Sequence, residues 1–205
     1  YLSGHPLEKY RSIMEKMISA RTIDFQPDDE TGIPKVYDGQ KVIIGGMITE
    51  KTIKYTRNNK VMAFLTVEDL MGTVEIVVFP RDYEKWQTLI NEDARVFIQG
   101  RVNAEDDKPS KLILEKVRAF DDIPREIWIQ FKDREDYAQK EQELLNYLRG
   151  SVGTSAVVIY LKDVKAIKRL PAGYHVQISE FLIEELKKKY GDSNVKVVER
   201  VLKNF

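Results

Sequence analysis

The chain contains 205 residues, 42% of them hydrophobic, and its 33 basic side chains balance 33 acidic ones. This length suffices for one large or two small hydrophobic cores, while zero net charge excludes a general electrostatic attraction to nucleic acid or anionic membranes. The absence of cysteine excludes disulfides, thiolate zinc sites and cysteine nucleophiles.

Two further absences bear on location. No apolar run approaches the roughly 20 residues of a membrane helix, and the first residues lack the pattern of a signal peptide. We therefore expect a cytoplasmic protein with no membrane partner. Because the sequence does not begin with Met, we also expect it to be a fragment of something longer.

Residues 1–39 predict a helix followed by a connector. Pro6 suits the first position of a helix, where a missing N–H costs nothing. An apolar stripe at helical spacing extends the helix over residues 7–20: Tyr10, Ile13, Met14, Met17 and Ile18. Residues 22–39 hold Pro27, Gly32, Pro34 and an acidic run, which are typical of a connector.

Residues 40–123 predict an OB-fold, a five-stranded Greek-key barrel. Strands are expected at 40–55, 61–67, 73–80, 95–104 and 111–120, and a short helix at 81–90 lies between the third and fourth. Gly45 and Gly46 in the first strand permit sharp bending or close backbone approach. A helix after the third of five strands is the element order of the OB-fold, which binds oligonucleotides across strands 2 and 3.

The hairpin at residues 61–80 has an unusual outer face. Its inward positions are apolar, whereas Phe64, Thr66, Glu75, Val77 and Phe79 have the opposite parity. Two aromatic rings on an outward face suit the stacking of nucleic-acid bases. The alternative is that these rings pack beneath a neighbouring loop or domain.

Basic and amide side chains near this hairpin complete a candidate binding groove. Cations neutralise phosphates and rings stack on bases, so both are needed for single-strand binding. The candidate nucleic-acid-binding residues are Lys51, Lys54, Tyr55, Arg57, Asn58, Lys60, Phe64, Glu75, Phe79, Arg101 and Asn103. The alternative is a solvated loop whose charges protect the rim of the barrel.

Residues 124–205 predict a second, α+β domain. Strands are expected at 127–131, 154–161, 174–178 and 194–201, and helices at 134–149 and 179–190. The order βαββαβ resembles the split βαβ arrangement, a four-stranded sheet with two helices on one face. Lys187, Lys188 and Lys189 end the second helix, where its dipole favours cations, so we interpret them as structural.

No pattern for catalysis is present. The chain lacks the phosphate-binding loop, the nucleophile elbow and the paired-histidine zinc motif. Its acidic pairs lie in turns and connectors, where solvation explains them. We therefore expect a binding protein with no catalytic residues, no metal and no cofactor.

Three segments together resemble a known family. YLSGHPL at residues 1–7, MAFLTVED at 62–69 and VEIVVFP at 74–80 are similar to the C-terminal region of the alpha subunit of bacterial DNA polymerase III, the C-family replicative polymerases. The resemblance implies that the intact protein is a DNA-directed DNA polymerase whose palm, with its metal-binding aspartates, lies upstream. It also implies an OB domain that handles single-stranded template and a following domain that contacts replisome partners, in some members the clamp-loader subunit tau.

The family's sliding-clamp motif, Q-x-x-L/M-F, has a poor match here. The nearest segment is residues 177–181, where Glu180 replaces the apolar fourth residue at a helix cap. In the family the motif tends to precede the OB domain. The resemblance therefore places the clamp contact upstream of Tyr1.

The related OB domain of aspartyl-tRNA synthetase offers a comparison at the level of residues. There an aromatic residue five before the turn aspartate stacks on a base, and Phe64 holds that place relative to Asp69. A polar residue three after the turn glycine reads a base edge, and here it is Glu75. A carboxylate repels phosphate and accepts only from amino groups such as those of cytosine or adenine.

Three functional interpretations follow. The first is a non-catalytic part of a replicative polymerase that binds single-stranded DNA through the barrel. The second is a protein-interaction module whose hairpin face docks on another polymerase domain or on the clamp loader. The third, an RNA-binding adaptor of the synthetase type, shares the barrel but does not explain residues 1–7.

Overall fold

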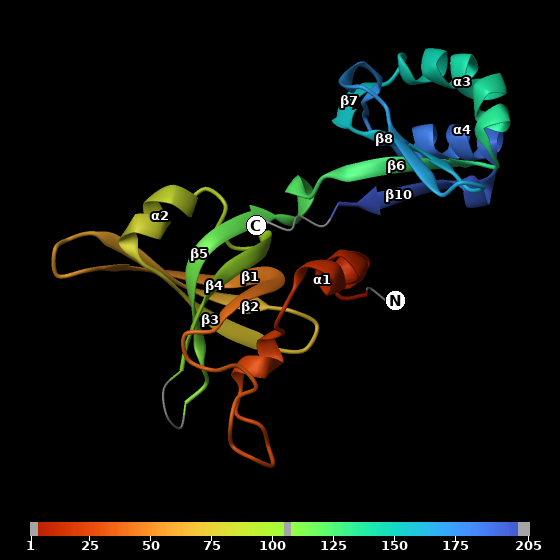
Figure 1. Cartoon of the computed structure of the whole chain (residues 1–205). Coiled ribbons are helices and arrows are strands. Elements are labelled where there is room, and N and C mark those ends of the chain that lie inside the picture. The colour runs from red at the N-terminus through yellow and green to blue at the C-terminus, as the bar shows by residue number, and fades with distance from the viewer. Residues whose placement is uncertain (1–3, 105–107, 201–205) are drawn as a thin grey trace. The chain divides into compact units, whose positions relative to one another are not determined.

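The computed structural model describes residues 4–104 and 108–200, which form two compact units (Figure 1). The first unit ends at Ile123 and the second comprises Pro124–Arg200. Each unit has its own hydrophobic core.

Five strands of the first unit close into a barrel. They are β1 (Lys41–Tyr55), β2 (Val61–Glu68), β3 (Thr73–Val78), β4 (Arg95–Asn103) and β5 (Lys111–Ala119). Their order around the barrel is β1-β2-β3-β5-β4, with a parallel β3–β5 pair among otherwise antiparallel neighbours. Helix α2 (Pro80–Trp86) follows β3. The OB-fold expected from the element order is confirmed.

Alternating apolar residues along these strands build the core. Ile44 and Ile48 of β1, Leu65 of β2 and Ile76 of β3 are at most 1% exposed. Each fully buried side chain of this size contributes about 1.5–3 kcal/mol. The expected helix over residues 81–90 ends earlier, at Trp86, and Ile90 is fully buried in the barrel core.

Glycines allow two strands to approach their neighbours closely. A Cβ at Gly46 would stand 2.4 Å from the carbonyl oxygen of Glu68, and one at Gly100 would stand 2.2 Å from that of Ile113. Both distances are impossible for a real side chain. The expected close backbone approach in the first strand therefore occurs at Gly46.

The N-terminal helix is shorter than expected. A 3-10 turn, η1 (Glu8–Tyr10), leads into α1 (Arg11–Met17). The helix ends there because Ser19 pairs with β1: its N–H donates to the Ile43 carbonyl, and its hydroxyl accepts from the Ile43 N–H, both at 2.8 Å. Helix α1 packs with Phe97 and Phe120 in one apolar cluster, so it covers the β4 side of the barrel.

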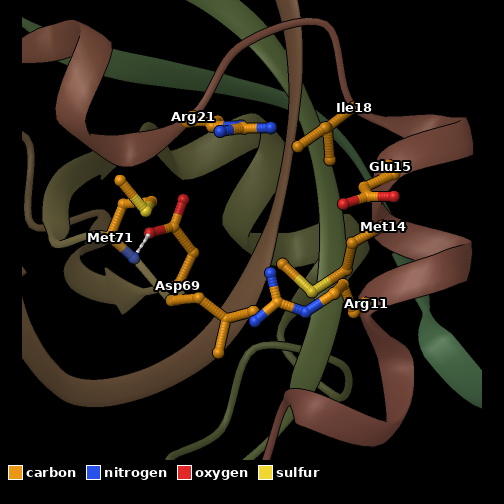
Figure 2. A pocket seen from close by; sticks show the side chains of 8 residues that line it. Arg11, Met14, Glu15, Ile18, Arg21, Asp69 and Met71 are labelled. Carbon is orange, nitrogen blue, oxygen red and sulfur yellow. Dashed lines mark hydrogen bonds between the residues drawn. The ribbon is translucent and has the colours of Figure 1, made fainter.

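The connector proves to be part of the barrel. It contains a 3-10 turn, η2 (Thr22–Phe25), and Phe25 is fully buried in the core. The buried carboxylate of Asp69, in the β2–β3 turn, accepts from the backbone N–H and hydroxyl of Thr22 at 2.9 and 2.6 Å. It also accepts from the N–H of Met71 (Figure 2) and from that of Gly72. One side chain thus shapes the turn and fastens the connector.

The second unit contains a four-stranded sheet of order β10-β6-β8-β9. Its strands are β6 (Arg125–Phe131), β8 (Val157–Leu161), β9 (Ala166–Arg169) and β10 (Val195–Glu199), and a short β7 (Val152–Ser155) lies apart. Helices α3 (Arg134–Leu148) and α4 (Glu180–Tyr190) pack on one face. The expected second sheet with two helices on one face is confirmed.

Two details of the sheet predicted from the sequence were wrong. The third strand lies at β9 and not at residues 174–178, because Val158–Leu161 and Ala166–Arg169 form a tight antiparallel hairpin. Within residues 174–178, Val176 makes only isolated bridges to Val152 and Ser155. The βαβ unit is also not split, since β6 and β8 are direct parallel neighbours.

We predict that Gly46→Ala destabilises the barrel by at least about 2 kcal/mol, because the methyl group would collide with backbone that cannot move aside. Gly72→Ala is the matched control, since its Cβ would meet only the Thr22 hydroxyl at 3.5 Å. Urea unfolding in a Trp128→Phe background, followed by Trp86 fluorescence, reports on the barrel alone. Equal midpoints for the two variants would contradict the proposed collision.

Asp69→Ala should cost about 3 kcal/mol or more, because four donors lose their acceptor and two of them are fully buried. Asp28→Ala serves as control, since Asp28 shapes a similar but exposed turn through Glu30 and Thr31. The same unfolding assay measures both. A loss at Asp69 no larger than at Asp28 would show that the connector is not held by this carboxylate.

Candidate nucleic-acid interface

The outer face of the barrel carries side chains in continuous rows across the strands. Strand register aligns one row in the order Thr52, Phe64, Val77, Ile113, Arg101. A second row contains Glu50, Thr66, Glu75, Lys111 and Asn103. The rows combine an aromatic ring, apolar neighbours and polar ends, which is a suitable composition for binding a single strand.

Phe64 lies near the middle of β2 and is half-buried. The Lys54 ammonium stands 5.0 Å from the centre of its ring, in a cation–π contact. An exposed contact of this kind contributes about 0.5–1 kcal/mol, so a stacking base could displace it. Phe79 is 45% exposed and precedes α2 directly, one residue beyond the end of β3.

Glu75 does not stand alone on this face. Its carboxylate forms an ion pair with the Lys111 ammonium at 2.8 Å. The pair is largely accessible to solvent, so its partners can rearrange at low cost. The carboxylate repulsion expected from the sequence is therefore reduced by a neighbouring cation.

Arg101 and Asn103 share the rows but lie three strands from Phe64, about 14 Å along the sheet at ordinary strand spacing. The Arg101 guanidinium donates to the Gly39 carbonyl at 3.3 Å and pairs with Glu115 at 3.5 Å. Both residues therefore lie at the far edge of the face. They could contact only a strand that crosses the whole barrel.

The tip of the β1–β2 hairpin supplies exposed cations. A backbone hydrogen bond from the Thr56 N–H to the Lys60 carbonyl closes this loop, and Asn59 has a φ of 59°. Arg57, Asn58 and Lys60 are exposed and form no side-chain hydrogen bond or ion pair with the described part of the chain. These side chains are available for phosphate.

Lys51 and Tyr55 do not belong to this face. The alternation of β1 places them on the side opposite Lys54. Lys51 donates to the Asn91 side chain at 3.1 Å and stands 5.4 Å above the Tyr83 ring. Burial in this position lowers the pKa of Lys51. Grouping cations by their place in the sequence ignored strand parity, so the expected single groove was wrong for these two residues.

Sequence reasoning missed several members of the face. Thr52 could have been found, because it has the parity of Lys54. Ile113 and Lys111 could not, because only the parallel β3–β5 pairing brings them beside Val77 and Glu75.

A small hollow lies between α1 and the β2–β3 turn, away from this face (Figure 2). Its volume of about 50 Å³ suits a few water molecules and is too small for a nucleotide. Its lining residues are Arg11, Met14, Glu15, Ile18, Arg21, Asp69, Leu70 and Met71.

Within residues 4–104 and 108–200, no group of three or more histidine and acidic side chains could hold a metal ion. No helix in the same described ranges is long and apolar enough to cross a membrane.

Comparison with known proteins agrees with the geometry. Residues 42–119 match the family described as OB-fold nucleic acid binding domain (tRNA_anti-codon). The chain is 25% identical over 205 residues to DNA polymerase III subunit alpha of Bacillus subtilis, and 24% identical over 210 residues to that of Escherichia coli K12. The alignments cover 95% and 96% of this chain but only 17% of each relative. The resemblance inferred from residues 1–7 and 62–80 is thereby confirmed.

Solved structures also align with this chain. The single-stranded DNA binding protein domain of Synechococcus aligns with a TM-score of 0.36 and 16% identity, over 40% of this chain and 97% of that one. Asparaginyl-tRNA synthetase of Pyrococcus horikoshii gives 0.36 and 20%, over 63% of this chain and 28% of that one. These scores are too low to bear on function.

Proposed function

We propose that this chain is the C-terminal part of a bacterial replicative DNA polymerase alpha subunit and that its barrel binds single-stranded DNA. The part is non-catalytic and takes the template strand, while the metal-binding palm lies elsewhere in the protein. Residues 124–205 contact replisome partners, the clamp-loader subunit tau among them. The observation that carries the proposal is the half-buried Phe64 ring on an open sheet face, with the Lys54 ammonium beside it.

The chemistry of binding divides between rings and cations. A base stacked on Phe64 would contribute about 1–3 kcal/mol whatever its identity, since every base has a π-face. Lys54, Arg57 and Lys60 would neutralise phosphates on one side of the ring, and each contact releases counterions. Binding is therefore modest, weakly dependent on sequence and dependent on salt.

Glu75 would add a preference among bases. Its carboxylate accepts a hydrogen bond only from a donor, such as the amino group of cytosine or adenine. In the free protein the Lys111 ammonium satisfies it. A base that offers an amino group would replace that contact, whereas thymine would not.

A protein-docking role is the second candidate. Val77 and Ile113 add apolar surface beside Phe64, which would also suit a partner protein. Helix α1 packs against Phe97 and Phe120 instead, so it is not the segment that would occupy the Phe64 face. Docking on a protein would show little of the salt dependence that phosphate contacts impose.

We predict that Phe64→Ala weakens binding of oligo-dT about tenfold, because a stacking platform is lost. Arg57→Ala should weaken binding less and reduce the salt slope by about one. Lys51→Ala is the matched control, since its ammonium faces Asn91 and Tyr83. Fluorescence anisotropy at several salt concentrations measures all three, and circular dichroism checks folding.

Equal affinity for Phe64→Ala, Lys51→Ala and the parent chain would exclude the proposed face. Tighter binding of oligo-U than of oligo-dT would favour the RNA-binding interpretation. No binding to either, with a retained fold, would favour docking on protein.

Glu75→Gln should increase the affinity for oligo-dT about threefold, because it removes a carboxylate that repels the DNA phosphates. The gain should shrink at high salt. The same anisotropy assay measures it, with Glu92→Gln as control on the loop before β4. A decrease in affinity would show that the carboxylate holds Lys111 in a position that binding requires.

A further inference from the structure

The sheet of the second unit has a face that its helices leave open. Alternate residues of β6, among them Ile127 and Ile129, are buried against α3 and α4, which lie on the same side of the sheet (Figure 1). The intervening residues, Trp128 and Gln130, point to the opposite side. The single-strand binding proposed for the barrel does not use this face.

Register brings two short rows together there. One row runs Lys196, Trp128, Val158, Arg169 and the next contains Gln130, Tyr160 and Ile167. Beside the second row, the Gln130 amide donates to the Asn194 side chain at 3.4 Å. Two aromatic rings, two amides and two cations therefore occupy one small surface.

A hollow of about 210 Å³ lies on this surface. It is lined by Trp128, Gln130, Tyr160, Ser193, Asn194 and Lys196. Its mixture of ring faces and hydrogen-bonding side chains resembles neither a purely apolar docking groove nor a solvated sheet. The hollow suits a flat group that also carries polar edges.

The Trp128 ring is held in place by a hydrogen bond to Glu126. Its indole N–H donates to the Glu126 carboxylate at 3.1 Å, and the Arg169 guanidinium bonds the other oxygen of that carboxylate. Glu126 is only 4% exposed. Burial opposes ionisation, but the bonds from Arg169 and Trp128 outweigh it and lower the pKa of Glu126. The ring is thus preorganised, which reduces the entropy lost when a ligand stacks on it.

Charge favours a polyanion over a neutral ligand. Lys196 is exposed and has no ion pair with any described residue. The Arg169 side chain is 49% exposed although it bonds Glu126. The residues of the two rows and of the hollow's lining include no carboxylate, and that of the adjacent Glu126 is buried and bonded to Arg169. The charge that these residues expose is therefore positive.

We propose that this face is a second single-strand site, at which bases of single-stranded nucleic acid stack on Trp128 and Tyr160. The amides of Gln130 and Asn194 meet base edges, and Lys196 with Arg169 meets the phosphates. Four-stranded sheets with helices behind them and aromatic residues in front bind unpaired strands by this physics. The site is separate from the barrel face and binds without it.

Tryptophan fluorescence tests the site, because the chain contains two tryptophans. In a Trp86→Phe background only Trp128 emits, and a short single-stranded DNA of mixed sequence should quench it to saturation. Tyr160→Ala should raise the Kd about tenfold. Lys196→Ala should raise it less and lower the salt slope by about one.

Three controls separate this proposal from the barrel site. Lys188→Ala removes an exposed cation from α4, on the helix side of the sheet, and should leave quenching unchanged. Phe64→Ala in the same background should leave the Kd for quenching within about twofold, even if barrel binding is lost. Trp128→Phe, with Trp86 retained, should abolish the site's signal, and circular dichroism should show each variant folded.

Absence of quenching in the folded Trp86→Phe chain would overturn the proposal. Loss of quenching in Phe64→Ala would assign the signal to the barrel and overturn it equally. Identical titrations for Tyr160→Ala, Lys196→Ala and the Trp86→Phe parent would show that this face does not bind the strand, leaving a protein as its occupant.

Discussion

Closure of the barrel by the parallel β3–β5 pair is the constraint on which the candidate interface depends. The pair involves Ile76 with Leu112 and Val77 with Ile113. Ile76 and Leu112 are fully buried and join the core, while Val77 and Ile113 face outward. The same contact therefore completes the core and makes one continuous outer row from Phe64 to Arg101. Without closure, the ring and the distant cation would lie on separate edges of an open sheet.

The two sides of the barrel have different roles. On the β4 side, α1 and the cluster around Phe97 and Phe120 cover apolar surface. The connector enters the core through Phe25 and is fastened by the Asp69 carboxylate. These interactions use the N-terminal residues to build the barrel. The face of β2 and β3 keeps the Phe64 ring, with Lys54 of β1 and Lys111 of β5 beside it, and this contrast favours a binding role for it.

The alternation of apolar and polar residues within each β-strand could be predicted from the sequence. It yielded the barrel, its apolar core and the outward position of Phe64. Contacts between distant strands could not be predicted. Lys51 was grouped with Lys54 by proximity, although parity alone separates them, whereas Lys111 beside Glu75 depends on a pairing that no local pattern encodes. In the second unit, β9 was missed because Ala166–Arg169 is short and mostly exposed, so it lacks the buried alternation that marks a strand.

The central claim, that unpaired DNA lies on the outer face of β2 and β3, is tested most directly by mapping amide chemical shifts in the isotope-labelled chain during titration with oligo-dT. The account predicts progressive changes at Phe64, Thr66 and Val77, with Phe97 and Phe120 unmoved. Changes confined to the Phe97 side, or none at saturating DNA in the folded chain, would contradict it.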